Sequence, residues 1–128
     1  MERKIKLGVI GAGRIGKLHA ENIIFSIPNA ELKAVADIYT DRIKNWAHGL
    51  GIKNVYSDYR EILEDPEIDA VMICSSTDTH AQIIIEAAEA GKHIFCEKPI
   101  DFDVDHIYQA LDAVEKAGVK LQIGFNRR

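Results

Sequence analysis

The chain has 128 residues, 47% of them hydrophobic and 28% charged, and a formal net charge of -4 at pH 7. This length and composition predict one globular domain with a buried core. The acidic balance and the absence of basic runs argue against nucleic-acid and membrane-surface partners, and no apolar stretch is long enough to span a bilayer. No signal peptide precedes the first apolar run, so we expect a cytoplasmic location.

Apolar runs alternate with stretches of helical periodicity along the whole chain. The apolar runs predict six strands, at residues 5–10, 31–36, 53–56, 70–74, 93–96 and 119–125. A helix is predicted between each strand and the next, and the third helix is short because Pro66 breaks it. Such alternation predicts an α/β fold with a parallel sheet, covered on both faces by right-handed crossovers.

Local signals predict further details of these elements. Asp58 and Thr79 are predicted to open the third and fourth helices, because each precedes a Glu or Gln by three residues.

Cys74 and Cys96 lie within apolar runs and are predicted to be buried, reduced thiols. The sequence shows no cluster of metal-ligating residues around them, so no metal site is predicted.

Three glycines with the spacing G-x-G-x-x-G follow the first strand. Gly11 permits a tight turn, Gly13 lets the backbone approach a pyrophosphate, and Gly16 lets the following helix pack against the strand. The helix directs unpaired N–H groups and the positive end of its dipole at the phosphates, so we assign Arg14 and Ile15 to the same site. The motif predicts a doubly wound Rossmann fold with strand order 3-2-1-4-5-6.

Asp37 ends the second strand, 21 residues after Gly16. This spacing fits the acid that binds both hydroxyls of the adenosine ribose in this fold. A 2′-phosphate there would face a like charge, so NAD is predicted over NADP. A charged hydrogen bond contributes about 1.5–3 kcal/mol, which implies a preference of roughly tenfold or more. Arg42 would weaken this preference if its side chain lay over the adenine edge, and a merely solvated acid at a strand end is the alternative.

Polar loops follow the fourth and fifth predicted strands, and the carboxyl ends of parallel strands meet at one edge of the sheet. Ser75, Ser76 and Thr77 leave the fourth strand and are predicted either to contact the cofactor or to cap the next helix. His80 lies in the first turn of that helix, where it either acts as a neutral hydrogen-bonding group in the site or lies on the helix surface. His19, on the first helix, is predicted to be structural.

Lys98 is the candidate catalytic residue. It lies between Glu97 and Pro99, directly after the fifth predicted strand. In a dehydrogenase its ammonium would stabilise developing negative charge on the reacting oxygen, and a crowded lysine can also transfer a proton. From the residues alone, a surface lysine is the alternative.

These segments resemble the glucose–fructose oxidoreductase and inositol dehydrogenase family. The similar stretches cover nearly the whole chain and read GVIGAGRIGKLHAENI, AVADIY, ICSSTDTHAQIIIEAAEAGKHIFCEKPI and VKLQIGFNRR. Within the family, the sequence is most similar to the inositol 2-dehydrogenases, which oxidise myo-inositol to its 2-keto form with NAD. The resemblance implies that Lys98 is catalytic and contacts both nicotinamide and substrate, and that the Lys98–Pro99 bond is cis. It also implies that the cofactor site is lined by Asp37, Ser75, Thr77, His80 and Glu97.

Members of this family continue into a second α/β domain. That domain supplies an aspartate, a histidine that acts as general base, much of the sugar-binding surface and the oligomer interface. The present chain ends at Arg128, where the second domain begins in the family. We therefore expect residues 1–128 to be an NAD-binding domain that binds NAD but does not turn over a polyol, while the parent is a homo-oligomer.

Two other possibilities remain at this point. The last predicted strand, residues 119–125, is apolar and edge-like, so the isolated domain is expected to form a strand-exchanged dimer. The alternative function is a free-standing dinucleotide-binding or redox-sensing module without catalysis, although such a module has no use for a lysine held before proline in the cleft. A methyltransferase is disfavoured, because its ligand has no pyrophosphate for the glycine loop to bind.

Overall fold

The computed structural model describes residues 4–124 and contains one sheet of six parallel strands. The strands are β1 (Ile5–Ile10), β2 (Ala30–Ala36), β3 (Asn54–Tyr56), β4 (Ala70–Ile73), β5 (His93–Glu97) and β6 (Leu121–Gly124). Their order is β3-β2-β1-β4-β5-β6, and every neighbouring pair is parallel. The predicted Rossmann fold and strand order are confirmed.

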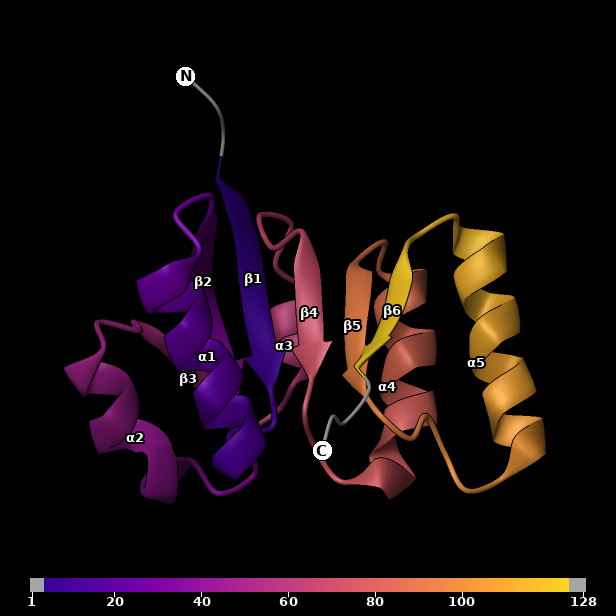
Figure 1. Ribbon diagram of the computed structural model, residues 1–128, viewed down its shortest axis with the longest axis horizontal. Helices are drawn as coiled ribbons and strands as arrows, with labels where there is room; N and C mark the ends of the chain where they lie inside the picture. Colours follow the sequence, from indigo (N-terminus) through magenta and orange to yellow (C-terminus); the bar gives the residue numbers. More distant parts are fainter. Residues whose placement is uncertain (1–3, 125–128) are drawn as a thin grey trace.

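Five helices connect the strands on both faces of the sheet (Figure 1). They are α1 (Arg14–Ser26), α2 (Thr40–Gly49), α3 (Arg60–Leu63), α4 (Thr77–Glu89) and α5 (Val104–Ala117). Successive strand residues point to opposite faces, so Val9 packs with α1 and α2 while Ile10 packs with α3 and α4. The sheet therefore separates two apolar cores. Among the helices of residues 4–124, none is both long and apolar enough to cross a membrane.

Several predicted element boundaries differ from the structure, most of them by one residue, and the N-cap residue of α3 is Tyr59 rather than the predicted Asp58. Helix α4 begins at Thr77 rather than Thr79, with Ser76 as its N-cap residue. The Thr79 hydroxyl instead donates to the Ser76 carbonyl oxygen at 2.6 Å, so the predicted capping box is wrong. The last strand begins at Leu121, two residues later than predicted, and its predicted end at residue 125 lies outside the described residues.

Strand β6 lies at the edge of the sheet and pairs with β5. An edge strand of this kind is what strand exchange requires. The structure describes one copy of the chain, and the strand-exchanged dimer stays a prediction.

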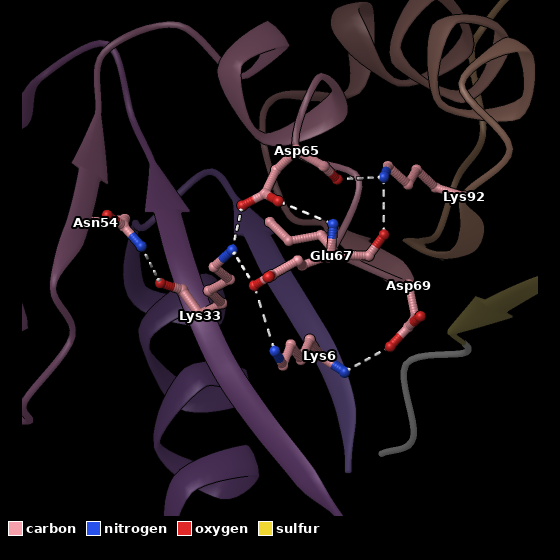
Figure 2. A network of polar contacts seen from close by, with 8 residues as sticks. Lys6, Lys33, Asn54, Asp65, Glu67, Asp69 and Lys92 are labelled. Atoms are coloured by element: carbon pink, nitrogen blue, oxygen red, sulfur yellow. Dashed lines mark hydrogen bonds and ion pairs between the residues drawn. The ribbon is translucent and has the colours of Figure 1, made fainter. Parts of the chain in front are cut away.

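A network of charged side chains lies near the amino ends of the strands (Figure 2). The pairing of β1 with β2 skips Lys33, which makes this residue a β-bulge. Its ammonium donates to Asp65 at 2.6 Å and to Glu67 at 2.9 Å, in the loop before β4. These hydrogen bonds raise the pKa of Lys33 and lower the pKa of both carboxyl groups. The network thereby joins β2 to a loop about 30 residues further along the chain.

The same loop is held from two further strands (Figure 2). The Lys92 side chain, buried just before β5, donates to the carbonyl oxygens of Asp65 at 2.6 Å and Ile68 at 2.7 Å. Its burial lowers the pKa of Lys92. The backbone N–H of Lys6 donates to the Asp69 carboxylate at 2.8 Å. The loop is thus held by β1, by β2 and by the residue just before β5, at the end of the sheet away from the predicted site.

We expect Lys33→Met to lower the free energy of unfolding at pH 7, and the deficit to shrink below about pH 4. The carboxyl groups of Asp65 and Glu67 have lowered pKa values in the folded state, so their contribution is present above the unfolded-state pKa and lost as they become protonated in acid. Denaturant titrations at pH 7 and at low pH measure both effects.

The matched control is Lys44→Met. The Lys44 ammonium lies 3.5 Å from Asp41, and both side chains are exposed, at 56% and 95%. Such exposed pairs contribute little to stability. Equal destabilisation by the two variants, or a Lys33→Met deficit that does not change with pH, would contradict the role of the network.

Candidate functional site

A cleft of about 680 Å³ lies at the carboxyl ends of the central strands. Its position is the switch point of the sheet, where β1 and β4 are neighbours and their connections leave in opposite directions. Five of the predicted site residues line it: Gly11, Gly13, Asp37, Ser75 and Ser76. The other predicted residues, among them Arg14 and Ile15 with their exposed side chains, do not line it.

A second hollow, of about 770 Å³, lies on the sheet face that carries no helix in front of β4, β5 and β6 (Figure 1). Apolar side chains such as Leu7, Met72 and Phe95 dominate its walls, and none of the predicted site residues lines it. It also lies away from the carboxyl edge, where ligands of this fold bind. We therefore place the functional site in the first cleft.

The three glycines of the loop meet different constraints. Gly11 has a φ of +92°, and a Cβ there would lie 2.6 Å from the Ser75 nitrogen. A Cβ on Gly16 would overlap the carbonyl oxygen of Gly11. Gly13 is different, because a Cβ would meet no atom of the described chain within 4 Å. The fold itself requires glycine at the first and third positions, whereas at Gly13 the space is open toward a ligand.

The start of α1 is suited to an anion. Gly13 is its N-cap residue, no side chain caps the helix, and the first turn contains no acidic residue. The first N–H groups of such a helix lack intrahelical partners and carry the positive end of its dipole. A pyrophosphate fits both the open space at Gly13 and these donors.

The Asp37 carboxylate holds the loops around the cleft together. One oxygen accepts from the Ala12 N–H at 2.8 Å and the other from the Tyr39 N–H, also at 2.8 Å. Each carboxylate oxygen retains a further lone pair, so the group can still accept from two ribose hydroxyls. The prediction of a merely solvated acid at a strand end is therefore wrong.

Apolar residues after Asp37 also line the cleft, although none of them was assigned to the site from the sequence. Ile38 is 76% exposed and Tyr39 is 55% exposed. The available signal in the sequence was two large apolar residues directly after Asp37, at the end of a predicted strand. The guanidinium of Arg42 lies 4.6 Å from the centre of the Tyr39 ring, which holds it at the border of this part of the cleft.

The segment after β4 is held by a chain of hydroxyl groups. Thr79 Oγ1 donates to the Ser76 carbonyl oxygen, and it lies 2.7 Å from Ser75 Oγ. Because the single hydroxyl hydrogen of Thr79 is used on the carbonyl, Ser75 is the donor in the second contact. The Ser75 oxygen can then accept a hydrogen bond from a ligand in the cleft.

His80 is buried, with 2% of its surface exposed. Its Nε2 lies 2.8 Å from the Ser75 carbonyl oxygen and its Nδ1 lies 2.8 Å from the Pro99 carbonyl oxygen. The prediction of a histidine on the helix surface is wrong. Both ring nitrogens face backbone oxygens, so the geometry also opposes the predicted direct bond to the cofactor.

Glu97 and Lys98 lie further along the same edge, at the end of β5. The Glu97 carboxylate lies 2.6 Å from His19 Nε2, and the His19 ring packs edge-on against Phe95. His19 thus contacts a predicted site residue, and its structural role stays a prediction. Lys98 is exposed, its N–H donates to the Gly124 carbonyl oxygen at 3.1 Å, and the Lys98–Pro99 bond is cis, as the resemblance implied.

Both cysteines are free thiols. Burial raises the pKa of Cys74 and of Cys96 to about 12, and the nearby Glu97 carboxylate adds to both shifts. The thiolate is the reactive form of cysteine, so these side chains are unreactive at neutral pH. This chemistry disfavours a thiol-based redox sensor. Residues 4–124 also contain no group of three or more side chains arranged to hold a metal ion.

Comparison with known proteins places these features in a family. Residues 5–125 match the oxidoreductase family with an NAD-binding Rossmann fold. Over its full length the chain is 58% identical to the oxidoreductase YrbE of Bacillus subtilis, and over 97% of its length it is 44% identical to the myo-inositol 2-dehydrogenase of Thermotoga maritima. It spans about 37% of the length of each of these relatives.

The fold matches solved structures equally well. The scyllo-inositol dehydrogenase of Lactobacillus casei, solved with bound NAD(H) and scyllo-inositol, superposes with a TM-score of 0.90 at 36% identity. The match covers 95% of the present chain and 36% of that structure. The chain thus belongs to the oxidoreductase family with an NAD-binding Rossmann fold and is an NAD-binding domain of the inositol dehydrogenase-like type.

Proposed function

We propose that this chain is the cofactor-binding half of a dehydrogenase that oxidises a ring hydroxyl of an inositol, with myo-inositol and its 2-keto product as the leading pair. The observation that carries the proposal is the glycine loop, in which Gly13 leaves open space beside an uncapped helix start. The 44% identity to a myo-inositol 2-dehydrogenase supports the substrate class. Bound NAD supplies the chemistry of accepting a hydride from the substrate carbon.

In this proposal different loop residues bind different parts of the cofactor. Gly11, Gly13 and the start of α1, with Arg14 and Ile15, hold the pyrophosphate. Asp37 accepts from the adenosine ribose hydroxyls with the lone pairs left free by its loop contacts. A 2′-phosphate at the same place would face this carboxylate, which favours NAD over NADP.

The loops after β4 and β5 bind the other half of the cofactor. Ser75, Ser76 and Thr77 hydrogen-bond the phosphates or the second ribose, and Glu97 borders the nicotinamide. Lys98 donates a hydrogen bond to the reacting oxygen and stabilises its developing negative charge. Its exposed position at the carboxyl edge leaves its side chain accessible to a substrate bound against this domain.

Oxidation of a hydroxyl also requires a base for the hydroxyl proton. We assign that base, and most of the sugar-binding surface, to a second domain like the one that the family resemblance implies. The relatives are long enough for such a domain, since the chain spans about 37% of their length. The whole enzyme is proposed to be a cytoplasmic homo-oligomer, and residues 1–128 alone to bind NAD without turnover.

Alanine at Gly13 and at Gly16 should separate binding from folding. Gly13→Ala meets no neighbouring atom, so the unfolding midpoint should stay within about 1 °C while NADH affinity falls roughly tenfold, the effect of one lost charged hydrogen bond. Gly16→Ala overlaps the Gly11 carbonyl and should destabilise the fold by about 1–3 kcal/mol. Thermal unfolding and calorimetric titration measure the two effects. Unchanged NADH affinity in folded Gly13→Ala would contradict the placement of the pyrophosphate.

Titration with NADH and NADPH should show tighter binding of NADH by roughly tenfold or more. Asp37→Ser should narrow this ratio, because it removes the charge that opposes a 2′-phosphate. The ratio is the informative quantity, since the variant also loses the contact with the Ala12 N–H and so weakens both ligands. Asp41→Ser removes an exposed acid on α2 and serves as the control, with an unchanged ratio. Equal affinities in the unsubstituted chain would refute the role of Asp37.

The isolated chain should bind NADH but form none from NAD and myo-inositol above the background rate, because the proposed base is outside it. Absorbance at the NADH band in long incubations measures this. Turnover that depends on both myo-inositol and Lys98, tested with Lys98→Gln, would show that residues 1–128 contain a complete active site.

A further inference from the structure

His80 joins two segments that leave neighbouring strands. The ladder between β4 and β5 has its last pair at Ile73 and Cys96, and beyond it the two chains diverge toward α4 and α5. His80 connects them past this point, with Nε2 at 2.8 Å from the Ser75 carbonyl and Nδ1 at 2.8 Å from the Pro99 carbonyl. The His80 side chain thus connects the two segments beyond the last backbone pair between β4 and β5.

The Pro99 carbonyl oxygen links the loop after β5, which contains Lys98, to His80 in α4, the helix that follows β4. Proline has no N–H, so the only backbone polar group of Pro99 is its carbonyl oxygen. On one side of it the Lys98 N–H donates to Gly124 in β6, and on the other Ile100 packs against the apolar core. The contact with His80 therefore ties the loop to α4, in addition to the contacts that tie it to β6 and to the apolar core.

We infer that His80 is a positioning residue for Lys98. Its ring sets the distance between the Lys98–Pro99 segment and the Ser75 segment that lines the cofactor cleft, without touching the cofactor itself. This inference rests on the proposed role of Lys98 beside the nicotinamide. Because hydride transfer depends on close alignment of the reacting groups, a lysine held on an unsupported loop would lose much of its effect.

Two amide side chains can separate the two contacts of the ring. Asparagine places its NH₂ group near the position of Nδ1, so His80→Asn can still donate to the Pro99 carbonyl. Glutamine places its NH₂ group near the position of Nε2, so His80→Gln can still donate to the Ser75 carbonyl but loses Pro99. The proposed role requires a hydrogen on Nδ1, because a neutral ring donates through only one of its nitrogens; with the hydrogen on Nε2 alone, His80→Gln would behave like the native chain, which would overturn the role.

The experiment titrates the chain and both variants with NADH and with ADP-ribose, which has both riboses and the pyrophosphate but no nicotinamide. We expect His80→Gln to bind ADP-ribose within about twofold of the native affinity and to lose roughly three- to tenfold of its preference for NADH. His80→Asn should retain that preference. A residue with a merely structural role would weaken both ligands together.

Hydrogen exchange provides a second readout that needs no ligand. The Lys98 amide, bonded to Gly124, should exchange faster in His80→Gln than in His80→Asn. The Gly11 amide, bonded to Ala36 at 2.8 Å on the far side of the cleft, should be equally protected in both. This comparison also shows whether either variant has lost its fold.

The two hypotheses fail in different ways. No NADH binding by the native chain would refute the proposed function, while the exchange of the Lys98 amide would still test the positioning role. Native preference for NADH in His80→Gln, with unchanged exchange at Lys98, would overturn the role of His80. Equal loss of NADH and ADP-ribose in both variants would overturn it as well, because His80 would then act only as a core residue.

Discussion

The close contact between the first turn of α1 and the end of β1 is the constraint on which the site depends. A side chain at Gly16 would overlap the Gly11 carbonyl, and one at Gly11 would strike the backbone of Ser75. Backbone from β1, α1 and the segment after β4 therefore meets without any side chain between. This arrangement places the uncapped start of α1 at the switch point, and the cleft exists because these three segments approach so closely.

Around this contact, polar side chains of the carboxyl edge hold the loops in place. Asp37 ties the glycine loop to the end of β2, and the Ser75 hydroxyl is anchored through Thr79. Glu97 is joined to α1 through His19. Partly buried polar groups need partners, and here each of the three has one within the chain. The site is therefore organised before a cofactor arrives, which lowers the entropy lost on binding.

The sequence predicted those features that depend on local pattern. Strand order followed from alternating elements and the glycine motif, and Asp37 followed from its spacing. The partners of His80 and Glu97 could not be predicted, because they lie 19 and 78 residues away and follow no fixed spacing. The start of α4 was missed for a different reason: Ser76 and Thr79 both carry cap-forming hydroxyls, and in the structure the Thr79 hydroxyl contacts the Ser76 carbonyl and the Ser75 hydroxyl inside the first turn instead of capping a helix.

The open space at Gly13 has a consequence for sequence design. A method that chooses residues to suit this backbone alone finds a position with ordinary dihedral angles and no neighbour, so it has no reason to place glycine there. Selection for folded, stable chains would likewise accept alanine at Gly13 while keeping Gly16. Under the proposed function, glycine at this position is maintained by selection for binding a molecule outside the polypeptide.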